Sequence, residues 1–308
     1  MVVGWNMKRF VLTAVGLGVA AAVVATSLTL RPDDTSTVSA SAPGAPPHTT
    51  PATEVSTPHS TPTADERARL AAAVTGAVTG RVPGATVGLA LWDTGTGELL
   101  ASVNGDRQFY TASVVKLLMA LDVLHTGGWH APGDAQRARI AAMLSASADD
   151  AADAYWHAGG RGAIVTRMAT LMNLPDTTPP RVSDQWEMTR TTPNDLVTAY
   201  RYLTTEVPPE AREPVLDGLA TTRARAADGF PQHFGLPDGL PGLPYAVKQG
   251  WMEISRSVVL NTTGLAGEDY RYVAVLLTEL PRGTGFPTGR AALTAGIEAL
   301  RPTVAGLP

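Results

Sequence analysis

The order of strand-like and helix-like segments is the feature that most constrains the fold of this chain. Apolar, β-compatible runs occur at residues 85–92 and 98–103, and again near the C-terminus at residues 245–252, 255–262 and 270–278. Between the two groups lie amphipathic, helix-like segments separated by Gly and Pro. Strands at both ends of a domain pair across whatever separates them. The sequence therefore predicts an α/β fold of the α+β type, in which helices flank an antiparallel sheet with an inserted all-helical subdomain.

Local signals predict the individual elements. Residues 93–97, Asp-Thr-Gly-Thr-Gly, predict a hairpin turn between the first two strands. Gly264 and Gly267 predict a loop between the last two strands. The expected helices span residues 65–78, 113–124, 137–146, 150–156, 162–172, 193–203 and 289–300.

Residues 10–30 form an apolar run preceded by Lys8 and Arg9. Its length is enough to span a bilayer and exceeds the usual apolar core of a cleavable signal. The positive charges place residues 1–9 in the cytoplasm and everything downstream outside it. We therefore expect a single-pass anchor in the cell membrane with an extracytoplasmic C-terminal domain. Val38-Ser39-Ala40 is similar to a cleavage site, so a secreted form remains an alternative.

Residues 31–63 are rich in Ser, Thr, Pro and Ala and contain almost no large apolar side chain. Such a segment cannot bury enough surface to offset its ordering entropy, so we expect a disordered, extended linker. The folded domain is then expected at residues 64–308.

Composition excludes several classes of function. The net charge is −4 without basic blocks, which argues against a nucleic-acid partner. The absence of cysteine excludes disulfides, thiolate metal clusters, a cysteine nucleophile and a lipid-modified cysteine. The histidines of the expected domain show no metal-ligand spacing, and we expect neither a metal nor an organic cofactor; they are His125, His130, His157 and His233. We expect a monomer.

Lysine is nearly absent, since only Lys8, Lys116 and Lys248 occur among the 24 basic residues. Lysine, unlike arginine, can lose its proton and act as a base. Ser113 lies three residues before Lys116 at an expected helix start, so both share one face. A neutral lysine can take the serine proton, although a serine N-cap followed by a solvated lysine is the structural alternative. Apolar neighbours favour the catalytic interpretation.

Lys248 lies on an expected strand and is followed by Gln249, Gly250 and Trp251. A glycine in a strand marks a close approach of another group to the backbone. An edge-strand charge beside a bulge is the alternative interpretation.

Together these residues resemble the serine β-lactamase and penicillin-binding protein superfamily, whose sites combine Ser-x-x-Lys, Ser-Asp-Asn and Lys-Thr-Gly. Residues 113–116, Ser-Val-Val-Lys, match the first motif. Residues 147–149, Ser-Ala-Asp, and 248–250, Lys-Gln-Gly, are similar to the second and third. The resemblance covers nearly all of residues 64–308 and is closest to class A. It implies a β-lactamase/transpeptidase-like fold.

The resemblance also implies roles for the motif residues. Ser113 would be the acylated nucleophile and Lys116 its base, and Ser147 would pass a proton to the leaving amine. Lys248 would hold this network and the substrate carboxylate. The backbone N–H groups of Ser113 and Trp251 would form the oxyanion hole.

Three positions depart from the family pattern. Asp149 replaces an Asn that contacts substrate and lysine, and adds a negative charge that could pair with Lys116 or Lys248. Gln249 replaces the hydroxyl residue that contacts the substrate carboxylate, which leaves Arg256, on the next expected strand, as a substitute. Class A enzymes also place a Glu before Thr-Thr-Pro to activate the deacylating water. Glu187 is the nearest acidic residue in this chain, although its loop is expected to be truncated and a surface role is the alternative.

The sequence therefore predicts an exported serine hydrolase that forms an acyl-enzyme at Ser113. The resemblance implies a β-lactam or a peptidoglycan peptide amide as the small-molecule substrate. Two alternatives remain open. One is a D,D-peptidase, which would not need the deacylating Glu. The other is a catalytically silent homologue that binds the cell wall, which the residues Asp149 and Gln249 suggest.

Overall fold

A computed structural model describes residues 62–306, which lie in one compact unit. Its main sheet is antiparallel and has the strand order β2-β1-β7-β6-β5. The five strands come from both ends of the described chain: β1 (Thr86–Asp93), β2 (Glu98–Val103), β5 (Tyr245–Glu253), β6 (Ser257–Ala266) and β7 (Tyr272–Pro281). The first and last groups pair where β1 meets β7. This arrangement confirms the predicted antiparallel sheet with an inserted helical part.

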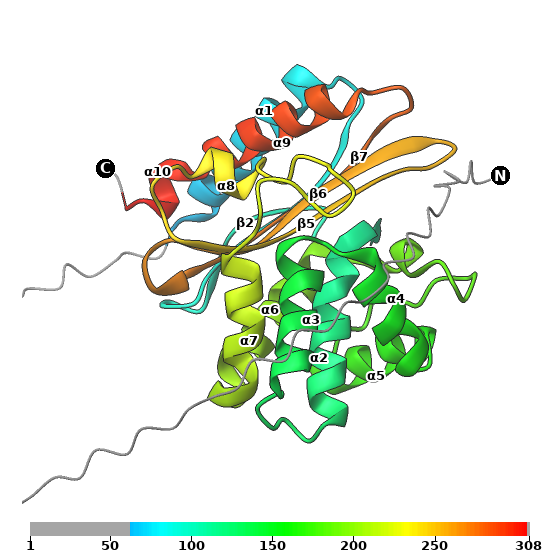
Figure 1. Ribbon diagram of the computed structural model, residues 1–308. Coiled ribbons are helices and arrows are strands. Elements are labelled where there is room, and N and C mark those ends of the chain that lie inside the picture. The colour runs from blue at the N-terminus through cyan, green and yellow to red at the C-terminus, as the bar shows by residue number, and fades with distance from the viewer. Residues whose placement is uncertain (1–61, 307–308) are drawn as a thin grey trace, which may run out of the picture. The chain divides into compact units, whose positions relative to one another are not determined.

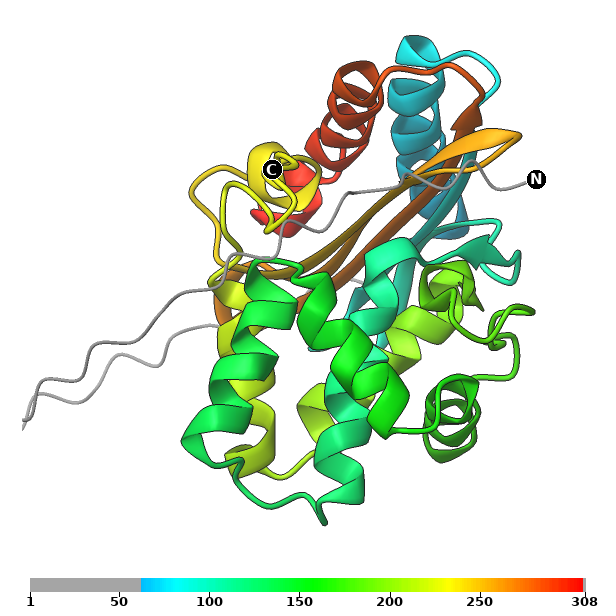
Figure 2. The ribbon, with the colours of Figure 1, turned by 45° about the vertical axis from the view of Figure 1, so that its right-hand side comes forward.

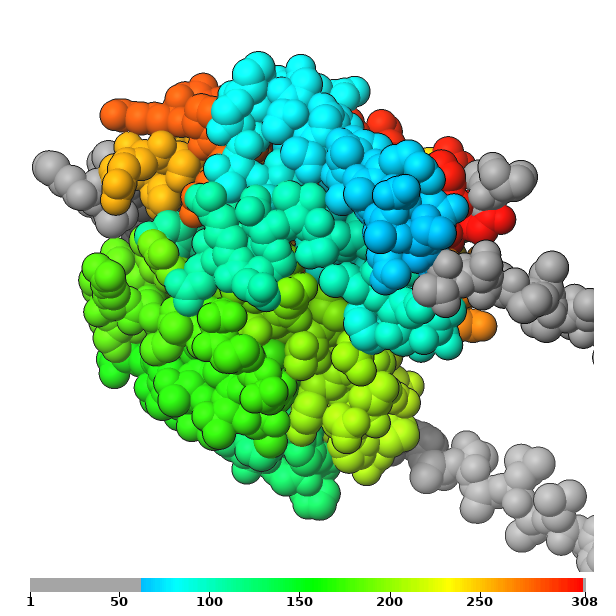
Figure 3. All heavy atoms as spheres, turned by 180° about the vertical axis from the view of Figure 1, so that it is seen from behind, coloured from blue at the N-terminus to red at the C-terminus, as the bar shows by residue number. Residues whose placement is uncertain are grey.

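Helices cover both faces of this sheet (Figures 1 and 2). One face carries α1 (Ala64–Arg81), α8 (Leu236–Gly239), α9 (Phe286–Glu298) and α10 (Arg301–Val304). The other face carries the helical half: α2 (Lys116–Thr126), α3 (Asp134–Ser145), α4 (Asp149–Ala158), α5 (Gly162–Met172), α6 (Pro193–Thr205) and α7 (Pro209–Ala220). Seen from behind, the green helical half and the rest of the unit meet along the middle of the molecule (Figure 3).

Side-chain alternation along the strands produces two separate cores. In β7, Ala274 and Leu276 pack with α1 and α9, whereas Val273 and Val275 pack with the helical half. Successive side chains of a strand point to opposite faces, so a strand buried on both faces is apolar at nearly every position. This explains why residues 270–278 read as a continuous apolar run.

Five short elements lie in the connections: β3 (Phe109–Tyr110), η1 (Ala112–Val115), η2 (Trp186–Met188), β4 (Arg190–Thr191) and η3 (Glu268–Tyr270). Strand β3 pairs with β4 in a second, two-stranded sheet. Helix α1 begins with a capping box, in which Thr63 Oγ1 accepts from the Glu66 N–H at 3.2 Å and Glu66 Oε2 accepts from the Thr63 N–H at 2.7 Å.

The structure corrects three element predictions. Gly264 lies inside β6 rather than in a loop. A glycine is needed there because a side chain would overlap the Ala246 carbonyl of β5. Ser113 lies in η1, and helix α2 begins only at Lys116. Helix α7 was not predicted, and it has prolines at 208, 209 and 214. The first two of these prolines lie at the helix start, where the missing N–H is tolerated.

Within residues 62–306, no helix combines the length and the apolarity needed to cross a membrane. The predicted anchor at residues 10–30 and nearly all of the predicted linker, residues 31–61, lie outside the described residues. Both stay predictions.

Candidate active site

The predicted nucleophile, Ser113, lies in a strained turn between β3 and α2. Ala112, directly before it, has a φ of 45°. This left-handed conformation costs a non-glycine residue about 1 to 2 kcal/mol, so the surrounding structure must hold it in place. Ser113 is the second residue of η1 and is only 6% exposed.

The sheet holds this turn through two residues. Asn261 of β6 donates from Nδ2 to the carbonyls of Tyr110 and Thr111, at 2.9 and 3.1 Å. Its partner in the adjacent strand is Gly250, where a Cβ atom would lie 2.6 Å from the Thr111 carbonyl oxygen. The close backbone approach predicted at this glycine is therefore present. The sheet fixes the position from which Ser113 can attack.

Lys116 lies at the centre of the hydrogen-bond network. Its Nζ is 3.1 Å from Ser113 Oγ, 2.8 Å from the Ser147 carbonyl oxygen and 3.2 Å from Ser147 Oγ. It also pairs with Asp149 Oδ1 at 2.6 Å. The Lys116 side chain is fully buried, and the ring of Trp186 lies over it with 4.7 Å between Nζ and the ring centroid.

Burial lowers the pKa of Lys116 below its usual value, because a charged amine loses its hydration inside the protein. Asp149, through its charge and hydrogen bond, and the charges of Asp228 and Asp153 act in the opposite direction. The lowered pKa increases the fraction of neutral amine, the form that can accept a proton.

Ser147 joins the two lysines of the site. Its Oγ is 3.2 Å from Lys116 Nζ and 3.0 Å from Lys248 Nζ. Ser147 also has a left-handed backbone, with a φ of 52°, in the connection between α3 and α4. Lys248 is fully buried, and burial together with the positive charge of Lys116 lowers its pKa well below the usual value. The structure thus brings together Ser113, Lys116, Ser147 and Lys248 from η1, α2, the α3–α4 connection and β5.

Trp251 lies on β5, the edge strand of the sheet. Thr222 Oγ1, outside the sheet, donates to the carbonyl of Val247 at 3.1 Å, whereas Thr263 Oγ1 of β6 donates to the carbonyl of Lys248. Backbone groups of alternate residues face the same side of an antiparallel strand. The N–H of Trp251 therefore points away from β6, on the side of β5 packed against η1, where it is available as a donor.

Two predicted substrate contacts lie elsewhere. Gln249 is fully buried, and its Nε2 donates to the carbonyls of Gln232 and Phe234 at 2.9 and 2.6 Å. Its amide therefore binds the segment before α8 instead of facing a substrate. Arg256 is exposed and lies in the turn between β5 and β6, not on a strand. The residue opposite Gln249 in β6 is Thr262. Strand β6 begins at Ser257 rather than at residue 255, so Arg256 stays in the turn instead of joining the strand.

Glu187 lies in η2, next to the Trp186 that covers Lys116. Burial raises the pKa of the Glu187 carboxyl, and the negative charges of Asp149 and Asp153 raise it further. A backbone hydrogen bond and the positive charge of Lys116 act in the opposite direction.

Sequence reasoning missed three residues of the site. Asp228 accepts a hydrogen bond from Trp251 Nε1 at 3.1 Å. Trp186 covers Lys116, and Asn261 holds the nucleophile turn. Only Asn261 had a signal in the sequence, because it begins a polar triplet, Asn-Thr-Thr, inside the apolar run of β6.

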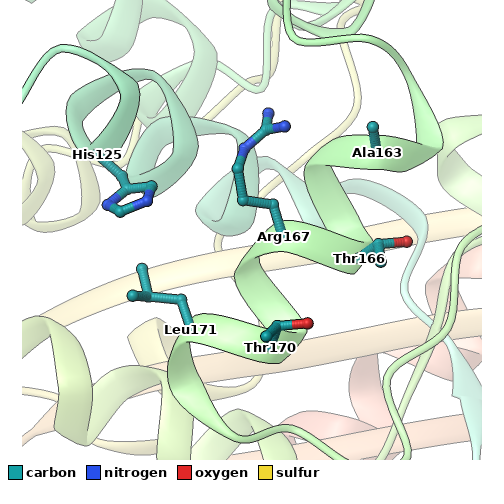
Figure 4. A pocket seen from close by; sticks show the side chains of 6 residues that line it. All are labelled: His125, Ala163, Thr166, Arg167, Thr170 and Leu171. Atoms are coloured by element: carbon teal, nitrogen blue, oxygen red, sulfur yellow. The ribbon is translucent and has the colours of Figure 1, made fainter.

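A cavity of about 500 Å³ lies between α2 and α5, away from this network (Figure 4). It is lined by His125, Ala163, Thr166, Arg167, Thr170 and Leu171. None of the predicted site residues lines it. Among residues 62–306, no group of three or more His, Asp or Glu side chains is arranged to hold a metal ion.

Comparisons with known proteins agree with this fold. A family model described as "Beta-lactamase enzyme family" matches residues 69–127. LppW, a candidate lipoprotein of Mycobacterium tuberculosis, is 34% identical over 225 residues, which cover 71% of this chain and 70% of LppW.

Solved structures are similar in fold. A β-lactamase from Sphaerobacter thermophilus matches with a TM-score of 0.62 and 19% identity, over 77% of this chain and 98% of that chain. A β-lactamase from Burkholderia vietnamiensis matches with a TM-score of 0.63 and 19% identity, over 81% and 100%. A mutant of PBP-A, solved as an acyl-enzyme complex with penicillin G, matches with a TM-score of 0.60 and 22% identity, over 78% and 97%.

Proposed function

The chain belongs to the serine β-lactamase and penicillin-binding protein superfamily, and we propose that it is a serine hydrolase that forms an acyl-enzyme at Ser113. The proposed substrate is a β-lactam or a peptide amide of the cell wall. Support comes from the network around Ser113 and from PBP-A, a protein of similar fold that was solved acylated by penicillin G.

One observation carries the proposal: the hydrogen-bond partners of Lys116 orient it as a base. The carbonyl of Ser147 and the carboxylate of Asp149 can only accept hydrogen bonds, and they lie 2.8 and 2.6 Å from Nζ. A neutral amine has two N–H groups, and these two acceptors use both. The nitrogen lone pair is then left to accept the proton of Ser113, whose Oγ is 3.1 Å away.

Acylation then proceeds by a balanced proton transfer. Ser113 Oγ bonds to the acyl carbon while its proton moves to Lys116 Nζ. The backbone N–H groups of Ser113 and Trp251 stabilise the developing oxyanion, and each such donor is worth about 3 to 4 kcal/mol of barrier. Ser147 gives its proton to the leaving nitrogen as the C–N bond breaks, and takes one from Lys116 at 3.2 Å.

Deacylation requires a second base. We propose Glu187, whose raised pKa brings it closer to neutral pH, where a general base is most effective. Glu187 would take a proton from the water as the water oxygen bonds to the acyl carbon. As the bond from this carbon to Ser113 Oγ breaks, that proton passes to Oγ, which yields the free acid, the regenerated serine and the carboxylate of Glu187.

We also propose that the protein is exported and associated with the cell envelope. Its relative LppW is named as a candidate lipoprotein. This chain has no cysteine that could carry a lipid, so the apolar run at residues 10–30 is the proposed attachment to the membrane.

Intact-protein mass spectrometry tests the proposed nucleophile. The full chain is incubated with penicillin G and, separately, with 4-nitrophenyl acetate, beside the variant Ser113→Ala. We expect an added acyl group on the wild type with at least one reagent and none on Ser113→Ala. The variant Glu187→Gln should prolong the lifetime of the adduct. An adduct retained in Ser113→Ala would place the nucleophile elsewhere.

The same experiment separates the two alternatives. A long-lived penicillin adduct in the wild type, with no effect of Glu187→Gln, would favour a D,D-peptidase-like enzyme. A wild type that reacts with neither reagent yet binds cell-wall material would favour the silent homologue, the interpretation suggested by Asp149 and by the inward-facing Gln249.

A further inference from the structure

A substrate that bears a carboxylate is attracted by positive charge, but the exposed charge next to Ser113 is negative. Asp149 Oδ1 and Ser113 Oγ are both hydrogen-bonded to one atom, Lys116 Nζ, at 2.6 and 3.1 Å. Any acyl group on Ser113 therefore lies within a few ångströms of the Asp149 carboxylate. The side chain of Asp149 is 59% exposed, whereas that of Lys116 is fully buried, so an arriving substrate meets the negative partner of this pair.

The reactive protonation state makes this charge more prominent. Lys116 must be neutral to accept the serine proton, so it cannot neutralise Asp149 at that moment. The pKa of the second lysine, Lys248, is also well below its usual value because of burial. Asp149 then stands beside the nucleophile as a negative charge without a full counter-charge.

A second carboxylate borders the other side of the site. Asp228 is exposed and accepts a hydrogen bond from the indole of Trp251, whose backbone N–H faces the same side of β5 as η1. Its negative charge acts on both Lys116 and Lys248. Asp149 thus begins α4, and Asp228 lies in the connection between α7 and α8, beside Trp251.

No arginine of residues 62–306 makes a side-chain hydrogen bond or ion pair with Ser113, Asp149 or Asp228. Gln249 is turned inward onto the carbonyls of Gln232 and Phe234, and Arg256 lies in the distant turn after β5. A substrate carboxylate next to Ser113 would therefore meet the exposed Asp149 beside the buried Lys116 and Lys248, whereas Arg225 is turned to the carbonyl of Gly229, beside Asp228. Opposite charges attract and like charges repel, and salt screens both effects where the charges are exposed.

We propose that Asp149 is a specificity-determining residue that selects acyl donors with a cationic group close to the reacting carbonyl and disfavours acyl donors with an anionic group there. This inference rests on the proposed acyl transfer at Ser113. The corresponding substrate class is an ester or amide of an acyl group that carries an amine, including a peptide amide with a free amino group. Carboxylate-bearing penicillins are then poor substrates.

A matched set of activated esters tests the charge preference. The probes are the 4-nitrophenyl esters of 4-(trimethylammonio)butanoic acid, 5,5-dimethylhexanoic acid and 4-sulfobutanoic acid, which share a leaving group and differ in charge. Release of 4-nitrophenol by the full chain gives kcat/KM for each ester at low ionic strength. We expect the cationic ester to exceed the anionic ester by about tenfold or more, with added salt reducing the ratio.

Asp149→Asn should bring this ratio close to one. The ratio cancels any effect of the substitution on Lys116, because all three esters share that step. Asp150→Asn is the matched control, because it removes the same charge from the next residue in the chain. The Asp150 side chain accepts a hydrogen bond from the Ala151 N–H. It should leave most of the preference intact.

The outcomes separate this inference from the proposed function. An anionic ester that reacts as fast as the cationic one, or an unchanged ratio in Asp149→Asn, overturns the charge selection while acylation at Ser113 still stands. If the rates of all three esters are equal in the wild type and in Ser113→Ala, the proposed function fails, and the inference fails with it.

Discussion

Asp149 is the residue that most raises the pKa of Lys116, the proposed base. Two opposing effects set the pKa of Lys116: burial lowers it, and the Asp149 carboxylate at 2.6 Å raises it. The larger effect is burial, so the amine titrates below its usual value. Asp149 thus has two separable effects in this proposal: it raises the pKa of Lys116, and it selects substrates by their charge.

We therefore predict that Asp149→Asn shifts the pH dependence of acylation. Removing the carboxylate destabilises the ammonium form of Lys116, so its pKa falls further. Because the neutral amine is the active form, the acidic limb of kcat/KM for a neutral ester should move to lower pH, by about one pH unit or more. The pH profile of 4-nitrophenol release measures this shift. A limb that stays in place, or moves to higher pH, would contradict the assignment of Lys116 as the base.

At the scale of elements, η1 packs against the edge strand β5, so Ser113, the proposed nucleophile, lies next to the strand that carries Trp251, the proposed oxyanion donor. Gly250 allows this contact, because a side chain there would collide with the Thr111 carbonyl. Asn261 reinforces it from β6. Strained residues such as Ala112 persist only where the surrounding structure determines their conformation.

We predict that Gly250→Ala pushes η1 away from β5. The added methyl group would lie 2.6 Å from the Thr111 carbonyl oxygen and 3.2 Å from Val114 Cγ2. We expect a loss of about 1 to 3 kcal/mol in the free energy of unfolding, as for other overpacked sites, and a fall of kcat/KM of tenfold or more. Urea unfolding and ester hydrolysis measure the two effects.

Gly76→Ala is the matched control for this substitution. Gly76 lies in helix α1, and nothing is within 4 Å of a Cβ atom at that position. Alanine is the better helix former, so this variant should gain about 0.5 to 1 kcal/mol and keep its activity. A stable and active Gly250→Ala would show that the η1–β5 contact is not needed.

At the scale of the whole molecule, the site lies where the helical half meets the sheet, and its two lysines are completely buried there. A lysine whose pKa is lowered by folding destabilises the folded state. The penalty appears as the pH falls below the unfolded value of about 10.4 and increases until the pH reaches the folded pKa. Stability linked to Lys248 therefore rises with pH across this window.

We predict that Lys248→Met raises the free energy of unfolding at pH 7, by about 1 kcal/mol or more, while lowering acylation. Methionine fills a similar space, and replacing buried charged groups by apolar ones is often stabilising. The gain should shrink at pH 9, because the wild-type penalty is smaller there. Urea unfolding at both pH values measures it. A variant less stable than the wild type at pH 7 would mean that the hydrogen bonds of Lys248 to Ser147 and Gln249 outweigh its desolvation.

The fold class and the pairing of Ser113 with Lys116 follow from the sequence. The strand-like runs at both ends and the helical middle required an antiparallel sheet. The three-residue spacing of Ser113 and Lys116 is local, and it survives although the turn is a 3-10 helix rather than the start of α2. Boundaries were less accurate where packing overrides local signals, as for Gly264 inside β6 and for the proline-rich helix α7.

The tertiary structure decided which residues surround this pair and which way they face. It joined Ser147 and Lys248 across 101 residues at 3.0 Å, turned Gln249 inward, and left Arg256 in a turn. It also added Asn261, Trp186 and Asp228, whose contacts come from elements far apart in the chain. Side-chain direction and burial depend on strand register and on packing between elements, and neither is encoded in the spacing of a motif.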